Sequence, residues 1–220
     1  MSADLQKILL SSDFQQQRLE LIETGHFLYK QGWMPATSGN FSVRLNDGHI
    51  AITASGRHKG KLSVEDITVV DSNGQALDNA TPSGETVLHT TLYKHASDIG
   101  AVLHSHSVNA TLLSTLCRDE LILQGYELLK AFPGIDSAEC NITVPVFDNV
   151  QDLSQLATQV NDYLDTHSPV FGYLITGHGL FTWGASINDA LHHIEAFEFL
   201  FECEMRKMQL QAEKNNSNKN

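Results

Sequence analysis

The apolar run at residues 99–103, followed by His104, Ser105 and His106, constrains this chain most strongly. The run reads as a buried strand that ends on two polar side chains. Alternate residues of a strand point to the same face of a sheet, so both imidazoles can be directed at one point. A single metal ion could bind both, but two core histidines bonded to backbone carbonyls would explain the same pattern. Residues elsewhere in the chain must decide between these readings.

A catalytic zinc site typically has three protein ligands and one open position, so a third histidine is needed. His178 fits best, because it follows another apolar run and two glycines flank it. The histidines on predicted helices form no HExxH pattern. Helical spacing suggests polar pairs for them instead, such as His89 with Tyr93 or His192 with Glu195.

Three short loops share a Ser-Gly pair, at residues 37–40 (TSGN), 53–60 (TASGRHKG) and 81–85 (TPSGE). Glycine lets a backbone approach a ligand closely, and successive N–H groups in such turns bind anions. Arg57, His58 and Lys59 would add positive charge, with Arg57 able to make a forked contact. A single Ser-Gly turn is commonly structural, but the recurrence of the pair favours a phosphate site.

Charge and cysteine content narrow the classes of partner and compartment. The chain has 14 Lys and Arg against 26 Asp and Glu, a formal net charge of -12, which would repel a nucleic-acid backbone. Its three cysteines lack CxxC spacing, so we expect a reducing compartment. The first residues lack the pattern of a signal peptide, and no apolar run approaches ~18 residues. We therefore expect a cytoplasmic protein that binds neither nucleic acid nor membrane.

Hydrophobic periodicity predicts an α/β fold in one domain, residues 1–212, with a polar disordered tail at residues 213–220. An Asp-Gly turn at residues 47–48 predicts a hairpin within residues 40–53. Helices are predicted at residues 14–32, 85–96, 107–116, 151–167 and 186–209, and further strands at residues 67–77, 99–106, 141–147 and 171–184. Hairpins and helices alternate along the chain, so we expect a mixed sheet with helices on both faces.

The ordered set SGN, Ser-Gly at residues 55–56, PSGE, HSH and GHG resembles the class II aldolase and adducin superfamily. The first histidine of HSH follows Glu85 by nineteen residues, and the resemblance runs from Gly39 to the C-terminal helix. It implies a three-layer α/β/α sandwich around a mixed, largely antiparallel sheet. It also implies one zinc ion per subunit, held by His104, His106 and His178, and a homo-oligomer, commonly a cyclic tetramer, with active sites near subunit interfaces.

The same resemblance assigns a phosphate pocket to the Ser-Gly loops, at positions that match Asn40, Ser55, Gly56, Ser83 and Gly84. It also gives Glu85 a role, because the aldolases carry a glutamate there that acts as acid or base. The related 4-epimerases carry an aspartate at that position, so Glu85 argues against an epimerase.

Three further segments, at residues 55–71, 126–132 and 145–153, are similar to the dehydratase branch of the superfamily. These lyases of methionine salvage remove water from a methylthio-substituted ribulose phosphate, with zinc as cofactor. The resemblance carries their acid/base role to Glu127. We therefore expect a hydro-lyase in which Glu127 moves the protons and Glu85 is a second-shell group or an alternative base.

Two other readings stay open from the sequence. A class II aldolase could cleave a different ketose phosphate through the same zinc enediolate. A non-catalytic, adducin-like scaffold module could use the fold for protein contacts. Such modules lack the histidine set, which this chain keeps, so the scaffold is the weakest of the three hypotheses.

Overall fold

Asp47 and Gly48 close a hairpin between strand β1 (Asn40–Arg44) and strand β2 (Ile50–Thr53). Gly48 has a φ of 88°, and its N–H donates to the carbonyl of Leu45 at 2.9 Å. Glycine adopts this left-handed backbone without a steric cost, so the Asp-Gly pair forms the turn. The predicted hairpin is confirmed.

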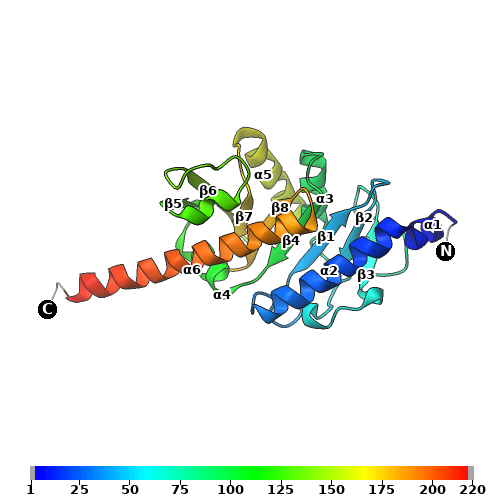
Figure 1. The fold of residues 1–220 in the computed structure, drawn as a ribbon, viewed down its shortest axis with the longest axis horizontal. Coiled ribbons are helices and arrows are strands. Elements are labelled where there is room, and N and C mark those ends of the chain that lie inside the picture. The colour runs from blue at the N-terminus through cyan, green and yellow to red at the C-terminus, as the bar shows by residue number, and fades with distance from the viewer. Residues whose placement is uncertain (1–2, 218–220) are drawn as a thin grey trace.

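This hairpin belongs to one eight-stranded sheet in the computed structural model, which describes residues 3–217 (Figure 1). The strand order is β3-β2-β1-β4-β8-β7-β6-β5, and every neighbouring pair is antiparallel except β6 and β7. The remaining strands are β3 (Ile67–Val70), β4 (Ala101–Ser105), β5 (Glu120–Gln124), β6 (Asn141–Phe147), β7 (Gly172–Ile175) and β8 (Gly179–Gly184). The sheet is therefore mixed and largely antiparallel, as predicted.

Helices cover both faces of this sheet. They are α1 (Ala3–Leu10), α2 (Ser12–Lys30), α3 (Thr86–His95), α4 (Val108–Leu116), α5 (Leu153–Thr166) and α6 (Ile187–Ser217). Short 3-10 turns are η1 (Lys59–Lys61), η2 (Val64–Asp66) and η3 (Glu127–Ala131). Within residues 3–217, no helix combines the length and apolar character needed to cross a membrane.

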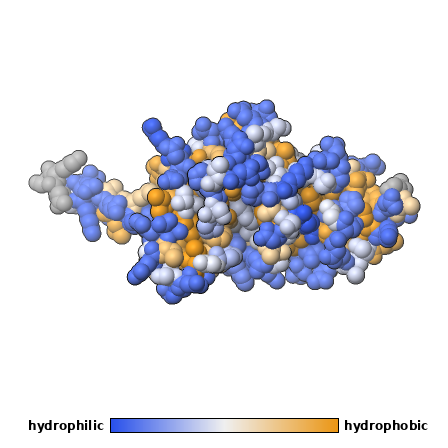
Figure 2. Space-filling view, turned by 90° about the horizontal axis from the view of Figure 1, so that it is seen from above, coloured by the Kyte–Doolittle hydropathy of each residue, from blue (hydrophilic) through white to orange (hydrophobic). Residues whose placement is uncertain are grey.

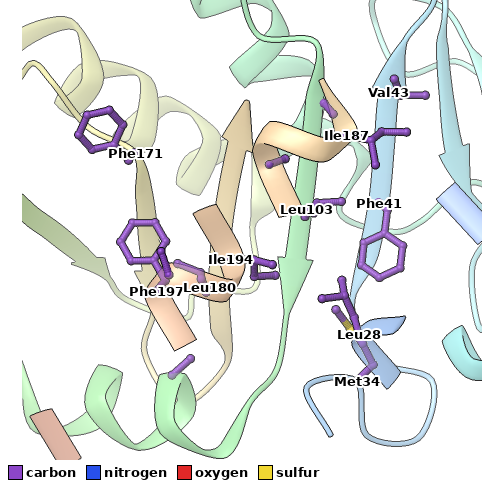
Figure 3. Close-up of a cluster of buried hydrophobic side chains, with 14 of the residues drawn as sticks. Leu28, Met34, Phe41, Val43, Leu103, Phe171, Leu180, Ile187, Ile194 and Phe197 are labelled. Atoms are coloured by element: carbon purple, nitrogen blue, oxygen red, sulfur yellow. The ribbon is translucent and has the colours of Figure 1, made fainter. Parts of the chain in front are cut away.

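Alternating residues of β4 build two separate cores. Leu103 packs with residues of α2 and α6, as Figure 3 shows beside Phe41 and Ile194. Val102 points to the other face and packs with residues of α3 and α5, such as Leu88. The three-layer α/β/α sandwich is confirmed, and it places β4, the strand that carries His104, in the middle of the sheet.

The structure differs from the prediction at the C-terminal end. Helix α6 continues through Ser217, so residues 213–217 of the expected disordered tail are helical, and residues 218–220 lie outside the described residues. Glutamate and lysine in this stretch are good helix formers, and they extend a helix that is already anchored on the sheet. Figure 1 shows this end of α6 projecting beyond the sheet.

Candidate functional site

Two neighbouring strands bring the three predicted histidines together. His104 lies in β4, His106 follows that strand, and His178 lies in the turn before β8. The Nε2 atom of His104 lies 2.8 Å from Nε2 of His106 and 3.3 Å from Nε2 of His178. Within the described part of the chain, this trio is the group of histidine, cysteine and acidic residues whose ligand atoms could hold a metal ion.

The close pairing of β4 with β8 depends on Gly179. A Cβ atom at this position would lie 1.9 Å from the carbonyl oxygen of Ser105. Glycine is therefore required beside His178, because a larger side chain would push β8 away from β4. Of the two glycines that flank His178, Gly179 thus has a steric role at the start of β8.

The environment favours the neutral form of two of these imidazoles, those of His104 and His106. His104 is fully buried, which lowers its pKa well below the usual value. Burial, together with the neighbouring His104 and His178, lowers the pKa of His106 to about 3. The Nδ1–H of His104 donates to the carbonyl of Leu180 at 2.9 Å, so its Nε2 presents a lone pair to the other two rings. Neutral imidazoles fixed in this way fit a divalent cation.

Glu85 completes the cluster from the start of α3. Its Oε2 lies 3.3 Å from Nε2 of His104, and its Oε1 lies 3.3 Å from Nε2 of His178. The side-chain amide of Asn40 donates to Oε2 at 2.6 Å. Oε1 is buried without a hydrogen-bond partner, so one carboxylate oxygen is held and the other is free to bind a cation or a proton.

A cavity of about 400 Å³ opens beside these side chains. It is lined by Glu85, His106, Asn149, Val150, Gln151, Leu153, Gly177 and His178. None of the predicted site residues lies between β6 and α5, although residues 145–153 contributed to the family resemblance. Residues 149–153 reach the cavity through the pairing of β6 with β7, which no local pattern shows.

A larger cavity, of about 720 Å³, lies around Trp183 and His193. Trp183 pairs with Val102 in the sheet, whereas Phe181 pairs with His104, so this cavity lies toward the other end of β4. None of the predicted site residues lines it. The smaller cavity is therefore the candidate active site, because Glu85, His106 and His178 line it.

The three Ser-Gly loops lie side by side near β1. The backbone N–H of Ser55 donates to the carbonyl of Thr81 at 2.9 Å, which joins the second loop to the third. The ammonium group of Lys59 donates to the carbonyl of Thr37 at 3.1 Å, which joins the second loop to the first. Asn40 pairs with His104 across β1 and β4, so these loops end next to the histidines.

Within the loops, the predicted phosphate ligands have different surroundings. A Cβ atom at Gly56 or Gly84 would meet nothing within 4 Å, so both backbones face open space. Lys59 is 2% exposed, and burial lowers its pKa to about 8. Its ammonium group also donates to the carbonyl of Arg57, whose own guanidinium pairs with Asp66 at 3.2 Å.

The structure does not bring Glu127 to the histidines within one chain. Glu127 begins η3, after the edge strand β5, and its side chain is 76% exposed. The carboxylate accepts a hydrogen bond from Lys130 at 2.6 Å. It does not line the 400 Å³ cavity, so any contact with that site would have to come from another copy of the chain.

Curated relatives resemble this chain over most of its length. A methylthioribulose-1-phosphate dehydratase from Azotobacter vinelandii is 54% identical over 195 residues, which cover 88% of this chain and 95% of the relative. The protein of the same name from Methylococcus capsulatus is 53% identical over 195 residues, covering 89% and 96%.

Solved structures share the architecture. An L-fuculose-1-phosphate aldolase from Thermus thermophilus aligns with a TM-score of 0.73 and 25% identity, covering 90% of this chain and 98% of that one. The YgbL protein of Klebsiella pneumoniae, with a TM-score of 0.74 and 24% identity over 86% of this chain and 88% of its own, supports the fold alone. Residues 19–205 match the family described as "Class II Aldolase and Adducin N-terminal domain". The chain therefore belongs to the class II aldolase and adducin family.

Proposed function

We propose that this chain is a hydro-lyase that converts 5-methylthioribulose 1-phosphate to 5-methylthio-2,3-dioxopentyl phosphate in methionine salvage. The observation that carries the proposal is the 54% identity, over 88% of the chain, to a relative named methylthioribulose-1-phosphate dehydratase. The histidine trio and Glu85 supply the side chains that such a reaction needs. An identity of this size over the whole fold supports a shared reaction as well as a shared architecture.

We propose one zinc ion per subunit, held by the Nε2 atoms of His104, His106 and His178. Bound zinc would supply Lewis acidity at the substrate oxygens and stabilise negative charge that develops there. Three neutral imidazoles leave the charge of the ion uncompensated, whereas thiolate ligands would neutralise it. Nitrogen ligands also suit other divalent metals, so the choice of zinc follows the family and the usual preference of imidazole.

Dehydration requires a base for the C3 proton and an acid for the C4 hydroxyl that leaves as water. Loss of that water gives an enol, which tautomerises to the 2,3-diketone. Glu85 lies at the histidines with one oxygen free, so it can take a proton or deliver one there. We propose Glu127 as the principal acid/base, because the family resemblance gives it this role. Glu85 is the alternative, because it is the glutamate that lies near the histidines within one chain.

The Ser-Gly loops are the proposed phosphate site, because their backbones meet beside β1 and face open space at two glycines. The proposed ligands are Asn40, Ser55, Gly56, Arg57, Lys59, Ser83 and Gly84. Binding the distant phosphate would fix C3 and C4 against the acid/base groups. The ammonium group of Lys59 holds two of the loops together, so its contribution includes shaping the pocket.

We propose that the active form is a homo-oligomer, a tetramer by family resemblance, in which Glu127 of one chain meets the histidines of another. Helix α4 starts beside His106 and exposes Val108, Leu112 and Leu116 at helical spacing. An exposed apolar stripe of this kind favours protein contact. The exposed position of Glu127 fits the same arrangement.

The proposed compartment is the cytoplasm, because the three cysteines are free. The proposed partner is a small sugar phosphate rather than a nucleic acid, since the net charge of -12 repels a polyanion.

The test is incubation of zinc-loaded protein with 5-methylthioribulose 1-phosphate, with products followed by mass spectrometry. We expect a product that has lost one water. The matched control is His104→Ala protein treated identically, which should leave the substrate unchanged. Carbon–carbon cleavage would instead select the aldolase, and an unchanged substrate with zinc bound would reject both the dehydratase and this choice of substrate.

A further inference from the structure

A chain of buried hydrogen bonds runs from Glu85 into the interior between β1 and α3. The amide nitrogen of Asn40 donates to Glu85 Oε2 at 2.6 Å, and the amide oxygen contacts Nε2 of His89. Nδ1 of His89 lies 2.7 Å from the hydroxyl of Ser42, which lies 2.8 Å from the hydroxyl of Tyr93. The four side chains beyond Glu85 are 0–5% exposed.

The periodicities of the two elements explain how this chain of bonds forms. Asn40 and Ser42 are two residues apart on β1, so both point to the same face of the sheet. Glu85, His89 and Tyr93 are four residues apart, so they lie one above another along α3. The strand and helix side chains therefore alternate along one line, in the order Glu85, Asn40, His89, Ser42, Tyr93.

The direction of every bond in this line follows from the orientation of the Asn40 amide. Its NH₂ group donates to Oε2 of Glu85, so its oxygen faces His89 as an acceptor. His89 must then carry its proton on Nε2, and its Nδ1 must accept from Ser42. The Ser42 hydroxyl is thereby free to accept from Tyr93. Burial lowers the pKa of His89 to about 4, so a neutral ring with one proton is expected.

We infer that His89, Ser42 and Tyr93 are positioning residues that fix the amide of Asn40 and, through it, the carboxylate of Glu85. This inference rests on the proposed function and adds residues that do not touch the substrate. With Oε2 held by Asn40, the unpartnered Oε1 is directed to the side of His178, which lines the cavity. If the Asn40 amide were reversed, its oxygen would face the carboxylate and repel it.

A purely structural role would make the same contacts and join α3 to β1. The two roles differ in what a broken bond changes. Loss of a structural bond lowers stability, whereas loss of a positioning bond lowers kcat while the fold, zinc content and KM are kept. The experiment therefore measures all four quantities for each variant.

Ser42→Ala removes the hydroxyl that holds Nδ1 of His89, so the ring that supports the Asn40 amide is no longer fixed on that side. We expect its kcat to fall about tenfold, the lower end of what outer-shell substitutions cost, with KM and zinc content changed less than about twofold. Thr90→Val is the matched control, because Thr90 is 3% exposed on the same helix and its hydroxyl donates to the carbonyl of Val87, outside this line of bonds. It should retain the kcat of the unmodified protein.

Tyr93→Phe should lower kcat by less than Ser42→Ala, because Ser42 can still donate to His89. The double variant should have the kcat of Ser42→Ala alone, since both changes act through one line of bonds. A kcat for Ser42→Ala equal to that of the Thr90→Val control would overturn the inference. A double variant in which the two losses multiply would also contradict it.

A second readout does not depend on turnover. In protein labelled with ¹⁵N-histidine, NMR spectra report which ring nitrogen carries the proton, and His89→Gln identifies the His89 signals. We expect the Nε2–H tautomer in the unmodified protein. In Ser42→Ala the chemical shift of the unprotonated Nδ1 should change, because this atom loses its hydrogen-bond donor. An Nδ1–H tautomer would overturn the inferred direction. If the unmodified protein binds zinc but fails to dehydrate the substrate, the proposed function fails, while the tautomer still tests the hydrogen-bonded line.

Discussion

At the scale of single residues, the proposed metal ligands and the proposed proton-transfer groups are different side chains, and substitutions should separate their roles. His104→Ala removes the ligand that contacts both other imidazoles, so we expect loss of most of the zinc and of activity. Glu127→Gln removes a proposed acid/base but no ligand, so zinc should stay bound while kcat falls roughly 10²–10⁴-fold. Measuring the zinc content and the kcat of both purified variants tests these two expectations. Equal zinc loss in the two would remove Glu127 from the mechanism.

A second residue-scale prediction concerns Glu198 on α6. It is 3% exposed, its Oε1 accepts from the Ser105 hydroxyl at 3.4 Å, and burial raises its pKa from 4.5 to about 7. Between pH 4.5 and 7 the folded state therefore keeps a proton that the unfolded state releases, so stability falls as pH rises through this window. Above pH 7, the free energy of unfolding has fallen by about 3 kcal/mol relative to its value below pH 4.5.

Glu198→Gln removes this titration, so the variant should gain stability relative to the unmodified protein as pH rises. Urea unfolding of the metal-free proteins at about pH 5 and about pH 8 measures the difference. Glu195→Gln, an exposed position on the same helix, is the control and should show no such gain. A stability difference that is the same at both pH values would contradict the prediction.

At the scale of elements, the pairing of β4 with β8 sets the distance between the ligands. Gly179→Ala places a Cβ atom against the carbonyl of Ser105, so we expect a loss of roughly 1–3 kcal/mol in unfolding free energy and weaker zinc binding. Chemical denaturation and zinc titration check both. Gly84→Ala is a suitable control for stability, because nothing lies within 4 Å of its Cβ position. An unchanged stability for Gly179→Ala would show that the strands can separate at little cost.

Local sequence patterns correctly predicted those elements that depend on a few adjacent residues. The Asp-Gly turn at Gly48 and the helical periodicity of α3 each depend on a few adjacent residues, and both are confirmed. Strand β5 was not predicted, because it has five residues and follows α4 after a short connection. The partners of Asn40 and the position of Glu127 depend on contacts between distant segments, which one sequence does not show. The bond of Lys59 to the carbonyl of Thr37 could not be predicted for the same reason.

At the scale of the whole molecule, exposed apolar side chains cluster on α4, β5 and α6, among them Leu116, Ile122 and Phe199. Figure 2 shows hydrophobic surface near the base of the projecting end of α6. Such surfaces favour assembly into the homo-oligomer proposed above. The assembly matters for chemistry because Glu127 does not reach the cavity of its own chain.

Mixing two inactive variants tests this arrangement. His104→Ala chains keep Glu127, and Glu127→Gln chains keep the histidines, so mixed oligomers should contain some complete sites. In an equal mixture made by co-expression, half of the chains supply intact histidines and the other half supply an intact Glu127. A site needs one of each from two different chains, so about one quarter of wild-type activity is expected. Each variant alone is the control. No recovery in verified mixed oligomers would place the acid/base within one chain and favour Glu85.

The histidines come from β4 and from the turn that opens β8, whereas much of the cavity wall comes from residues 149–153. Backbone pairing in the centre of the sheet thus fixes the positions of the proposed ligands. The connection between β6 and α5, outside the sheet, forms much of the cavity wall. Insertions or exchanges in that connection should therefore leave the spacing of the three histidines unchanged. Evolution, or a protein engineer, can therefore change which sugar phosphate is accepted while keeping the same reactive centre.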